Sequence, residues 1–390
     1  MKTEELYYQD ARRTEFDASV LSCVSEEKKG TYLAVLDRTA FFPEQGGQKS
    51  DLGVLGGAKV LDVRIRNDVI THVLDRPLEE GSRVIGTVDW DRRFDFMQQH
   101  TGEHMFSGRV HARFGYDNVG FRLSEGLTQL DFSGPIPPEA LKEIEEEVNE
   151  AIWKDIPVTA GYPEAEVLKH LEYRSKLDLT EGVRIVEIPG IDRCACCAPH
   201  VESTGQVGIL KIVSAMNYKG GVRIYIVCGK RALKDYGKLK ESVQGISVLL
   251  SAKQEEVFDA VSALKHKEQE NASRLVRLEE ELLHMQALSL PSPEETGNVL
   301  LFSECPDQNV LRREVNFLAE RYEGIAGIFT GTDSEGYRFV IGSRNTDLKA
   351  ILPGLRARGF KCGGGKEQIQ GSVSMTEEQI RSLFTEELVL

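Results

Sequence analysis

The chain of 390 residues has no apolar run that approaches the roughly 18 residues needed to cross a bilayer. Its first residues, Met1-Lys2-Thr3-Glu4-Glu5, carry acids where a secretory signal needs positive charge followed by an apolar stretch. It also has no excess of positive charge, because 48 lysines and arginines stand against 62 aspartates and glutamates, for a net charge of -14. These absences argue against a membrane protein, a secreted protein and a general nucleic-acid coat, and they predict a cytoplasmic location.

Cysteine is scarce and unevenly distributed. The chain has seven cysteines, an odd number, and three of them lie within Cys194-Ala195-Cys196-Cys197. In a long chain without a secretory signal, clustered cysteines are more typical of metal binding than of disulfide bonds. The cluster is therefore a candidate source of metal ligands.

The length predicts two or three domains, and the first half of the chain divides near residue 88. Apolar and polar residues alternate over 60–65 and 69–74, which is typical of half-buried strands. Closely spaced short strands predict a small β-barrel-like domain over 1–88. From residue 89 two helical patterns are followed by further strands, which predicts an α+β domain over 89–235.

The second half of the chain begins with a helical pattern over 236–293. Apolar residues at spacings of three and four continue from Val257 to Met285. This seam suits a helical hairpin, or a contact between two copies of the chain through 246–285. Residues 294–390 are predicted to form a C-terminal α/β domain, rich in glycine at Gly363-Gly364-Gly365, so the chain as a whole is of the α+β class.

Two pairs of residues have a spacing suited to metal binding. His100 and His104 lie four apart in a predicted helix, so that both imidazoles project from one face. Cys196 and His200 are also four apart, in a segment that Pro199 makes a turn. Either pair alone is weak evidence, but together they supply the nitrogen and sulfur donors of a tetrahedral zinc site. Cys194 or Cys197 could replace Cys196 as the sulfur ligand.

A competing motif overlaps the first pair. His100-Thr101-Gly102-Glu103-His104 matches the His-x-x-Glu-His pattern of inverzincin metallopeptidases, in which Glu103 would be the general base. Glu181 lies at a plausible distance downstream for a third ligand. This interpretation leaves Cys196 and His200 unexplained, so it is the second hypothesis. A non-catalytic, zinc-stabilised RNA-binding protein is the third.

Seven segments of the chain match the motifs of one known family in the same order. They are Thr39 to Gln48, Val88-Asp89 with Arg92-Arg93, His100 to His104, Cys196 to His200, Val201 to Ile212, Gly220 to Ile224, and Gly363 to Gly365. The chain resembles the editing half of alanyl-tRNA synthetase and the long form of the free-standing alanyl-tRNA editing proteins. That form carries a helical linker and a glycine-rich domain of the kind found with DHH phosphoesterases. Because no segment that could hold an aminoacylation core precedes the editing region, the resemblance implies an editor acting in trans.

The resemblance implies hydrolysis of the ester between a wrong amino acid, serine or also glycine, and alanine tRNA. Zinc would be held by His100, His104, Cys196 and His200, and Glu103 would act as base or support a ligand. A site that hydrogen-bonds a serine hydroxyl can reject alanine, because its polar groups would be left unpaired. Thr39 and Gln48 are the candidates for this role. The family's usual Cys-Gly-Gly-Thr-His is here Cys-Cys-Ala-Pro-His, so the ligands are kept and the glycines are not.

Two basic stretches stand out in the acidic chain. Residues 211–240 and 338–366 carry many lysines and arginines, against only Asp235 and Asp347 respectively. Both lie where the resemblance would place RNA, so the chain could confine its phosphate contacts to these faces. The residues predicted to contact tRNA are Gly46, Gly47, Lys219, Arg223, Lys230, Arg231, Arg356, Arg358, Lys361, Gly363, Gly364, Gly365 and Lys366.

Overall fold

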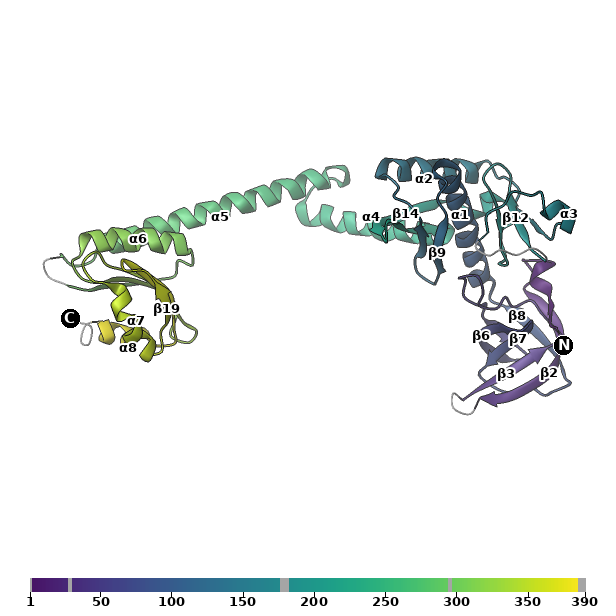
Figure 1. Ribbon diagram of the computed structural model, residues 1–390, viewed down its shortest axis with the longest axis horizontal. Coiled ribbons are helices and arrows are strands. Elements are labelled where there is room, and N and C mark those ends of the chain that lie inside the picture. Colours follow the sequence, from purple (N-terminus) through teal and green to yellow (C-terminus); the bar gives the residue numbers. More distant parts are fainter. Residues whose placement is uncertain (1, 27–29, 176–181, 294–296, 385–390) are drawn as a thin grey trace. The chain divides into compact units, whose positions relative to one another are not determined.

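The computed structural model describes residues 2–26, 30–175, 182–293 and 297–384 (Figure 1). The chain divides into two compact units, Met1–Ser242 and Val243–Leu390. Within the described ranges, separate sheets and eight α-helices confirm the predicted α+β class. No helix in these ranges combines the length and the apolarity that a bilayer crossing requires. The predicted boundaries after residues 88, 235 and 293 stay predictions.

The first unit begins with a closed barrel of six strands, in the order β2-β3-β7-β6-β5-β8. Alternating buried and exposed residues along β6 show why these segments form a barrel with one apolar lining. Asn67 and Asp68, both with positive φ, make the two-residue turn between β6 and β7. The elements are β1 (Glu4–Glu5), η1 (Leu6–Tyr8), β2 (Glu15–Glu26), β3 (Thr31–Leu36), β4 (Arg38–Thr39), β5 (Gly53–Leu55), β6 (Ala58–Arg66), β7 (Val69–Leu74) and β8 (Arg83–Val88).

A four-stranded sheet in the order β14-β15-β10-β9 packs against two helices. Asp89 caps the first helix by accepting a hydrogen bond from the Arg92 amide, and Gly115, in the left-handed region, ends it. The apolar stripe of the second helix, with Leu141, Ile144, Val148 and Ile152, is buried in the core. The elements are α1 (Trp90–Phe114), β9 (Asn118–Leu123), β10 (Thr128–Phe132), α2 (Pro138–Trp153), η2 (Thr204–Val207), β14 (Leu210–Tyr218) and β15 (Gly221–Cys228).

A small sheet in the order β11-β12-β13 lies against α1 and completes the first unit. Gly108 on α1 makes this close approach possible, because a Cβ there would lie 2.4 Å from the Ile191 carbonyl oxygen. The start of β13 therefore packs closely against α1 at Gly108. The elements are β11 (Thr159–Gly161), α3 (Ala165–Leu168), β12 (Ile185–Ile188) and β13 (Asp192–Ala195).

The second unit holds a long helix, α5, and a five-stranded sheet in the order β16-β17-β18-β20-β19 (Figure 1). Leu283 and Ala287 of α5 are buried against the α6 side of this domain, whereas Leu275, Leu278 and Leu282 of the predicted seam stay more than half exposed. The elements are α4 (Gly229–Leu250), which crosses the boundary between the units, η3 (Gln254–Glu256), α5 (Val257–Leu288), β16 (Val299–Ser303), α6 (Gln308–Arg321), β17 (Ala326–Thr332), β18 (Gly336–Gly342), α7 (Leu348–Ala357), β19 (Lys361–Gly364), β20 (Gln368–Val373) and α8 (Glu377–Ser382).

Candidate metal centre

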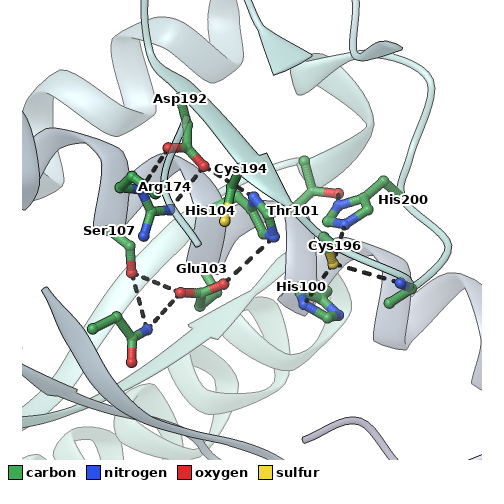
Figure 2. A network of polar contacts seen from close by, with 12 residues as sticks. His100, Thr101, Glu103, His104, Ser107, Arg174, Asp192, Cys194, Cys196 and His200 are labelled. Carbon is green, nitrogen blue, oxygen red and sulfur yellow. Dashed lines mark hydrogen bonds and ion pairs between the residues drawn. The ribbon is translucent and has the colours of Figure 1, made fainter. Parts of the chain in front are cut away.

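The four predicted ligands lie together in the first unit. His100 and His104 project from one face of α1, and Cys196 and His200 come from the loop that follows β13 (Figure 2). Their ligand atoms all lie within 4.8 Å of one another. The three imidazoles are buried and the thiol is half-buried. The fold thus joins the two sequence pairs into one cluster.

The spacing of the donor atoms fits a tetrahedral zinc ion. Zinc–nitrogen bonds of about 2.05 Å and zinc–sulfur bonds of about 2.3 Å, at a tetrahedral angle, place nitrogen and sulfur about 3.6 Å apart. Cys196 Sγ lies 3.6 Å from His100 Nε2 and 3.4 Å from His200 Nε2. The residues present therefore fit the ion that the sequence predicts.

Each imidazole uses Nδ1 for a hydrogen bond, which leaves Nε2 for the centre of the cluster. A hydrogen bond at Nδ1 fixes the tautomer and the ring orientation of a metal-binding histidine. The three pairs are His100 Nδ1 with Gln48 Oε1 at 2.8 Å, His104 Nδ1 with Asp192 Oδ2 at 2.9 Å, and His200 Nδ1 with Thr101 Oγ1 at 3.0 Å.

Asp192 is a functional residue that sequence reasoning missed. It begins β13, is buried, and bonds both to His104 and, through two oxygens, to Arg174 at 2.7 and 2.8 Å (Figure 2). Burial alone would raise the pKa of Asp192, but the bonds from His104 and Arg174 hold it below its usual value. Burial would lower the pKa of His104, but the bond to Asp192 raises it well above its ordinary value, so metal binding displaces a proton.

The charge state of the thiols distinguishes Cys196 from its neighbours. Burial opposes ionisation of Cys196, but the imidazoles of His100 and His200 bring its pKa well below the usual value. Burial raises the pKa of Cys194 to about 11, and burial together with Cys196 raises that of Cys197 to about 12. Of the three thiols, Cys196 is therefore the one that ionises most readily, as a thiolate ligand must. Burial lowers the pKa of His200 to about 3, which keeps this imidazole neutral, as a metal ligand must be.

Glu103 lies beside the cluster on α1. Its Oε1 accepts hydrogen bonds from Ser107 Oγ and from Asn118 Nδ2, both at 2.6 Å. Its Oε2 lies 3.9 Å from His104 Nε2, the nitrogen that faces the cluster (Figure 2). The carboxylate is buried, not on an exposed helix face, and the bonds from Ser107 and Asn118 fix its orientation beside the cluster.

The paired glycines form a tight hairpin turn that carries Gln48 to His100. Gly46 and Gly47 have φ values of 62° and 84°, a conformation that suits glycine. A Cβ at Gly47 would lie 2.9 Å from the Phe121 ring and carbonyl oxygen. That ring in turn lies 4.8 Å from the His100 imidazole, centroid to centroid. Both glycines are thus needed for the close packing of this turn.

Thr39 lies inside the barrel and contacts His72. Its hydroxyl is 2.9 Å from His72 Nε2 and accepts a hydrogen bond from the Phe41 amide at 3.1 Å. Burial lowers the pKa of His72 to about 4, so this imidazole is neutral. Its Nδ1 donates to the Ala34 carbonyl oxygen at 3.3 Å, so its Nε2 accepts from Thr39. Thr39 and Gln48, the two candidates for hydroxyl recognition, therefore have different surroundings. Gln48 bonds to His100 of the cluster, whereas the Thr39 hydroxyl bonds to His72.

The ligand loop is held firmly although it lacks the usual glycines. Ala198 is fully buried in the barrel core, against which Cys196 and Cys197 also pack. Arg184 donates to the carbonyl oxygens of Cys196 and Ala198 at 3.0 and 2.9 Å. These contacts fix the backbone of the loop through packing and hydrogen bonds. Cys196 and His200 therefore converge although the residues between them are Cys-Ala-Pro.

Three of the residues predicted to contact tRNA in the first unit, Arg223, Lys230 and Arg231, are engaged in ion pairs. Arg223 bonds to Asp131 through two nitrogens at 2.7 Å, and its guanidinium lies 3.7 Å from the Tyr218 ring centroid. Arg231 bonds to Asp95, and Lys230 lies 3.9 Å from Asp91. Lys219 has a positive φ in the turn between β14 and β15.

The remaining predicted tRNA contacts lie in the second unit, around the edge strand β19 and the end of α7. Arg356 and Arg358 bond to backbone carbonyl oxygens of this domain, and Lys366 lies 3.9 Å from Asp347. Lys361, Gly364, Gly365 and Lys366 are exposed, and Gly363 is half-buried. These residues thus lie together at one edge of the sheet.

The third ligand of the metallopeptidase hypothesis stays a prediction. Glu181 lies outside the described residues. The cluster instead includes Cys196 and His200, which that hypothesis leaves unexplained.

Comparison with known proteins gives two family matches and several relatives. Residues 183–225 match the threonyl and alanyl tRNA synthetase second additional domain, and residues 2–92 match the class II (A) tRNA synthetases. The alanine–tRNA ligase of Ignicoccus hospitalis is 31% identical over 413 residues, which cover 98% of this chain and 42% of the ligase. That of Pyrococcus abyssi is 30% identical over 410 residues, 98% of this chain and 43% of the ligase.

A shorter relative is the alanyl-tRNA editing protein Aarsd1 of Danio rerio. It is 31% identical over 271 residues, which cover 66% of each protein. The chain spans less than half the length of the alanine–tRNA ligases that it matches. The similarity therefore covers nearly all of this chain but only part of those enzymes.

Proposed function

This chain belongs to the alanyl-tRNA synthetase-related family of editing proteins, and we propose that it hydrolyses the ester of mischarged alanine tRNA. Serine is the proposed amino acid, with glycine as a second substrate. The observation that carries this proposal is the cluster of His100, His104, Cys196 and His200, whose donor spacing fits zinc. Two of its four residues, Cys196 and His200, lie in the segment 183–225 that matches the second additional domain.

The proposed cofactor is Zn²⁺, bound by one thiolate and three neutral imidazoles. When bound, it supplies positive charge that favours attack on the ester carbonyl. Gln48, Asp192 and Thr101 orient the three imidazoles through Nδ1. Because these partners are buried, the imidazoles keep one orientation while the substrate enters.

Glu103 is the proposed general base. Ser107 and Asn118 occupy its Oε1, and Oε2 is the oxygen on the side of His104 Nε2. In the proposed step Glu103 takes a proton from a water molecule whose oxygen attacks the ester carbon. The ester bond then breaks and the 3′-terminal ribose hydroxyl of the tRNA leaves, taking up a proton.

Selectivity for serine is proposed to come from polar groups that alanine would leave unpaired. The bond between Gln48 and His100 supports this role for Gln48. Thr39 would contribute from the barrel, where its hydroxyl bonds to His72. A Thr39→Val variant that clears serine and spares Ala-charged tRNA as well as wild type would contradict that role.

We propose alanine tRNA as the partner, contacted by the two basic stretches and by the Gly46-Gly47 turn. The acidic remainder of the chain would then limit phosphate contacts to these faces and favour release of the product. We also propose that the chain forms a homodimer, through 246–285 or through the C-terminal domain. The proposed location is the cytoplasm.

The decisive experiment is a deacylation assay on Ser-, Gly- and Ala-charged alanine tRNA, with and without a chelator. We expect Ser-tRNA to be hydrolysed, Ala-tRNA to be spared, and activity to be lost with chelator and restored by Zn²⁺. Glu103→Gln should lower kcat roughly 10²- to 10⁴-fold with zinc retained. Absence of deacylation by the zinc-loaded protein would refute the proposal.

The metallopeptidase stays the second candidate, because His100, Glu103 and His104 lie together as its motif requires. Peptide cleavage that is lost in Glu103→Gln, together with inactivity on Ser-tRNA, would support it. Binding of tRNA without hydrolysis would support the third candidate, a non-catalytic RNA-binding protein.

A further inference from the structure

Residues 50–52 follow the Gly46-Gly47 turn and are anchored to the first turn of α1. Each of the three accepts hydrogen bonds from this end of the helix, and two of the donors are adjacent arginines. The contacts are Arg92 Nε to the Ser50 carbonyl oxygen at 3.1 Å, Arg93 Nε to both Asp51 carboxylate oxygens at 3.0 and 2.9 Å, and the Asp89 amide to the Leu52 carbonyl oxygen at 2.9 Å. The loop is thus tied to the helix that carries His100 and His104.

The ion pair between Arg93 and Asp51 gives this anchor its direction. Both side chains are fully buried. Arg93 also donates to the carbonyl oxygens of Ala11 at 2.9 Å and Ala40 at 2.6 Å, and Asp51 accepts from the Phe42 amide at 2.6 Å. A buried ion pair adds little net stability over apolar side chains of the same volume, because both charges lose their hydration. Its bonds are directional, however, so one guanidinium fixes three separate stretches of the chain against α1.

The anchor and the metal cluster lie along one face of α1. Arg93 and His100 are seven residues apart, which is two helical turns or about 10.5 Å, so their side chains project from the same face. Their partners, Asp51 and Gln48, are three residues apart, and an extended chain of that length spans about 10–11 Å. The segment 48–51 therefore runs along the helix, with one end held at Arg93 and the other at His100.

The side chain of Gln48 depends on its backbone for its position. Its Oε1 accepts from His100, whereas its Nε2 has no hydrogen-bond partner within the part of the chain that the structure describes. The bond from β9 to the turn, at 2.9 Å, relates the turn to the sheet and not to α1. Only Lys49 separates Gln48 from residues 50–52. A displacement of 50–52 along α1 therefore moves the acceptor that orients His100.

We propose that Arg92 and Arg93 are positioning residues of the metal centre, which set the level along α1 at which Gln48 meets His100. The inference rests on the proposed function through its zinc site, and it gives a role to an arginine pair that takes no part in the reaction itself. Because the loop is held by buried bonds, the acceptor of His100 is in place before metal binds. The ligand is thus pre-organised, which reduces the cost of ordering it on binding.

A double-mutant cycle on zinc affinity tests the buried pair. Gln48→Ala removes the acceptor and should lower zinc affinity about 10- to 100-fold, as is typical when an outer partner is lost. Arg93→Met with Asp51→Leu replaces the pair by apolar side chains without leaving a lone charge, and it should lower the affinity roughly tenfold. In the Gln48→Ala background the same replacement should have no further effect. Losses that multiply in the combined variant would overturn the inference, because the pair would then act without Gln48.

Arg92→Met tests the second arginine while the buried pair stays intact. The Arg92 side chain is 13% exposed and also bonds to Glu125 at 2.7 Å. We expect zinc affinity to fall roughly three- to tenfold in Arg92→Met, and not to fall further when Gln48→Ala is already present. Glu125→Gln is the matched control, because it removes the ion pair and keeps the bond to Ser50, so its zinc affinity should equal that of wild type. Wild-type affinity in Arg92→Met, or an equal loss in Glu125→Gln, would overturn the inference.

The measurement does not depend on the reaction, since zinc affinity is read by competition with a chromophoric chelator in the absence of tRNA. If the cycle shows coupling but wild type cleaves no charged tRNA, the proposed function is wrong and the inference stands. If wild type cleaves Ser-tRNA and the losses multiply, the proposed function stands and the inference is wrong. A wild-type protein that binds no zinc would overturn both.

Discussion

Replacement of Asp192 tests how the metal centre is supported. Asp192→Ala removes the acceptor that orients His104, a bond of 2.9 Å, and it leaves Arg174 without its carboxylate partner. Loss of such an outer partner typically lowers metal affinity about 10- to 100-fold. Loss of one member of a buried ion pair costs about 3–5 kcal/mol of unfolding free energy. Both effects should appear, because the Asp192 side chain is only 2% exposed.

Arg174→Met separates the two effects. This variant also breaks the ion pair and should destabilise the fold, but the bond between His104 and Asp192 remains. Zinc affinity, measured by competition with a chromophoric chelator, should fall in Asp192→Ala and stay near wild type in Arg174→Met. Urea unfolding of the metal-free proteins measures the change in the free energy of unfolding for each variant. Wild-type zinc affinity in Asp192→Ala, or an equal loss in Arg174→Met, would refute the reasoning.

Three further predictions concern the sulfur ligand, a buried histidine and the helical seam. Cys196→Ala should lose stoichiometric zinc by elemental analysis while Cys197→Ala keeps it, and the reverse would move the ligand to Cys197. The folded-state pKa of His72 is about 4, below the ordinary 6.5, so its contribution to stability is complete above pH 6.5 and is lost as the pH falls toward 4. Urea titrations should show a loss of about 3 kcal/mol over this range, which His72→Gln abolishes; equal pH profiles would contradict this. Leu278→Glu should shift the proposed dimer to monomer in sedimentation equilibrium while the neighbouring Arg277→Glu does not, and an equal effect of the two would argue against the seam.

Helices and their faces were predictable because they depend on neighbours in the chain. The pattern over 138–153 predicts the observed helix, whose apolar side chains are buried at a spacing of three and four. The same geometry explains why His100 and His104 share a face of α1. The local spacing of His100 and His104 was therefore enough to predict that both lie on one face of the helix. That helix begins after its N-cap residue, Asp89.

The partners of those ligands were not predictable, because they come from distant parts of the chain. Gln48 and Asp192 lie 52 and 88 residues from the histidines that they orient. A lone glutamine or aspartate has no periodicity or spacing that signals such a contact. Thr39 illustrates the converse, since its motif is near that of Gln48 in sequence but its hydroxyl turns into the barrel toward His72.

Sequence alone determined which residue types could bind metal and on which local element each one lies, because helix pitch and turn residues act over a few positions. Tertiary structure decided which of the three clustered thiols has a lowered pKa, because burial and the neighbouring imidazoles act differently on each. It also decided that Gln48 and Asp192 reach the imidazoles of His100 and His104. Desolvation depends on what surrounds an atom, and for this site those surroundings are the barrel, α1 and the loop after β13 packed together.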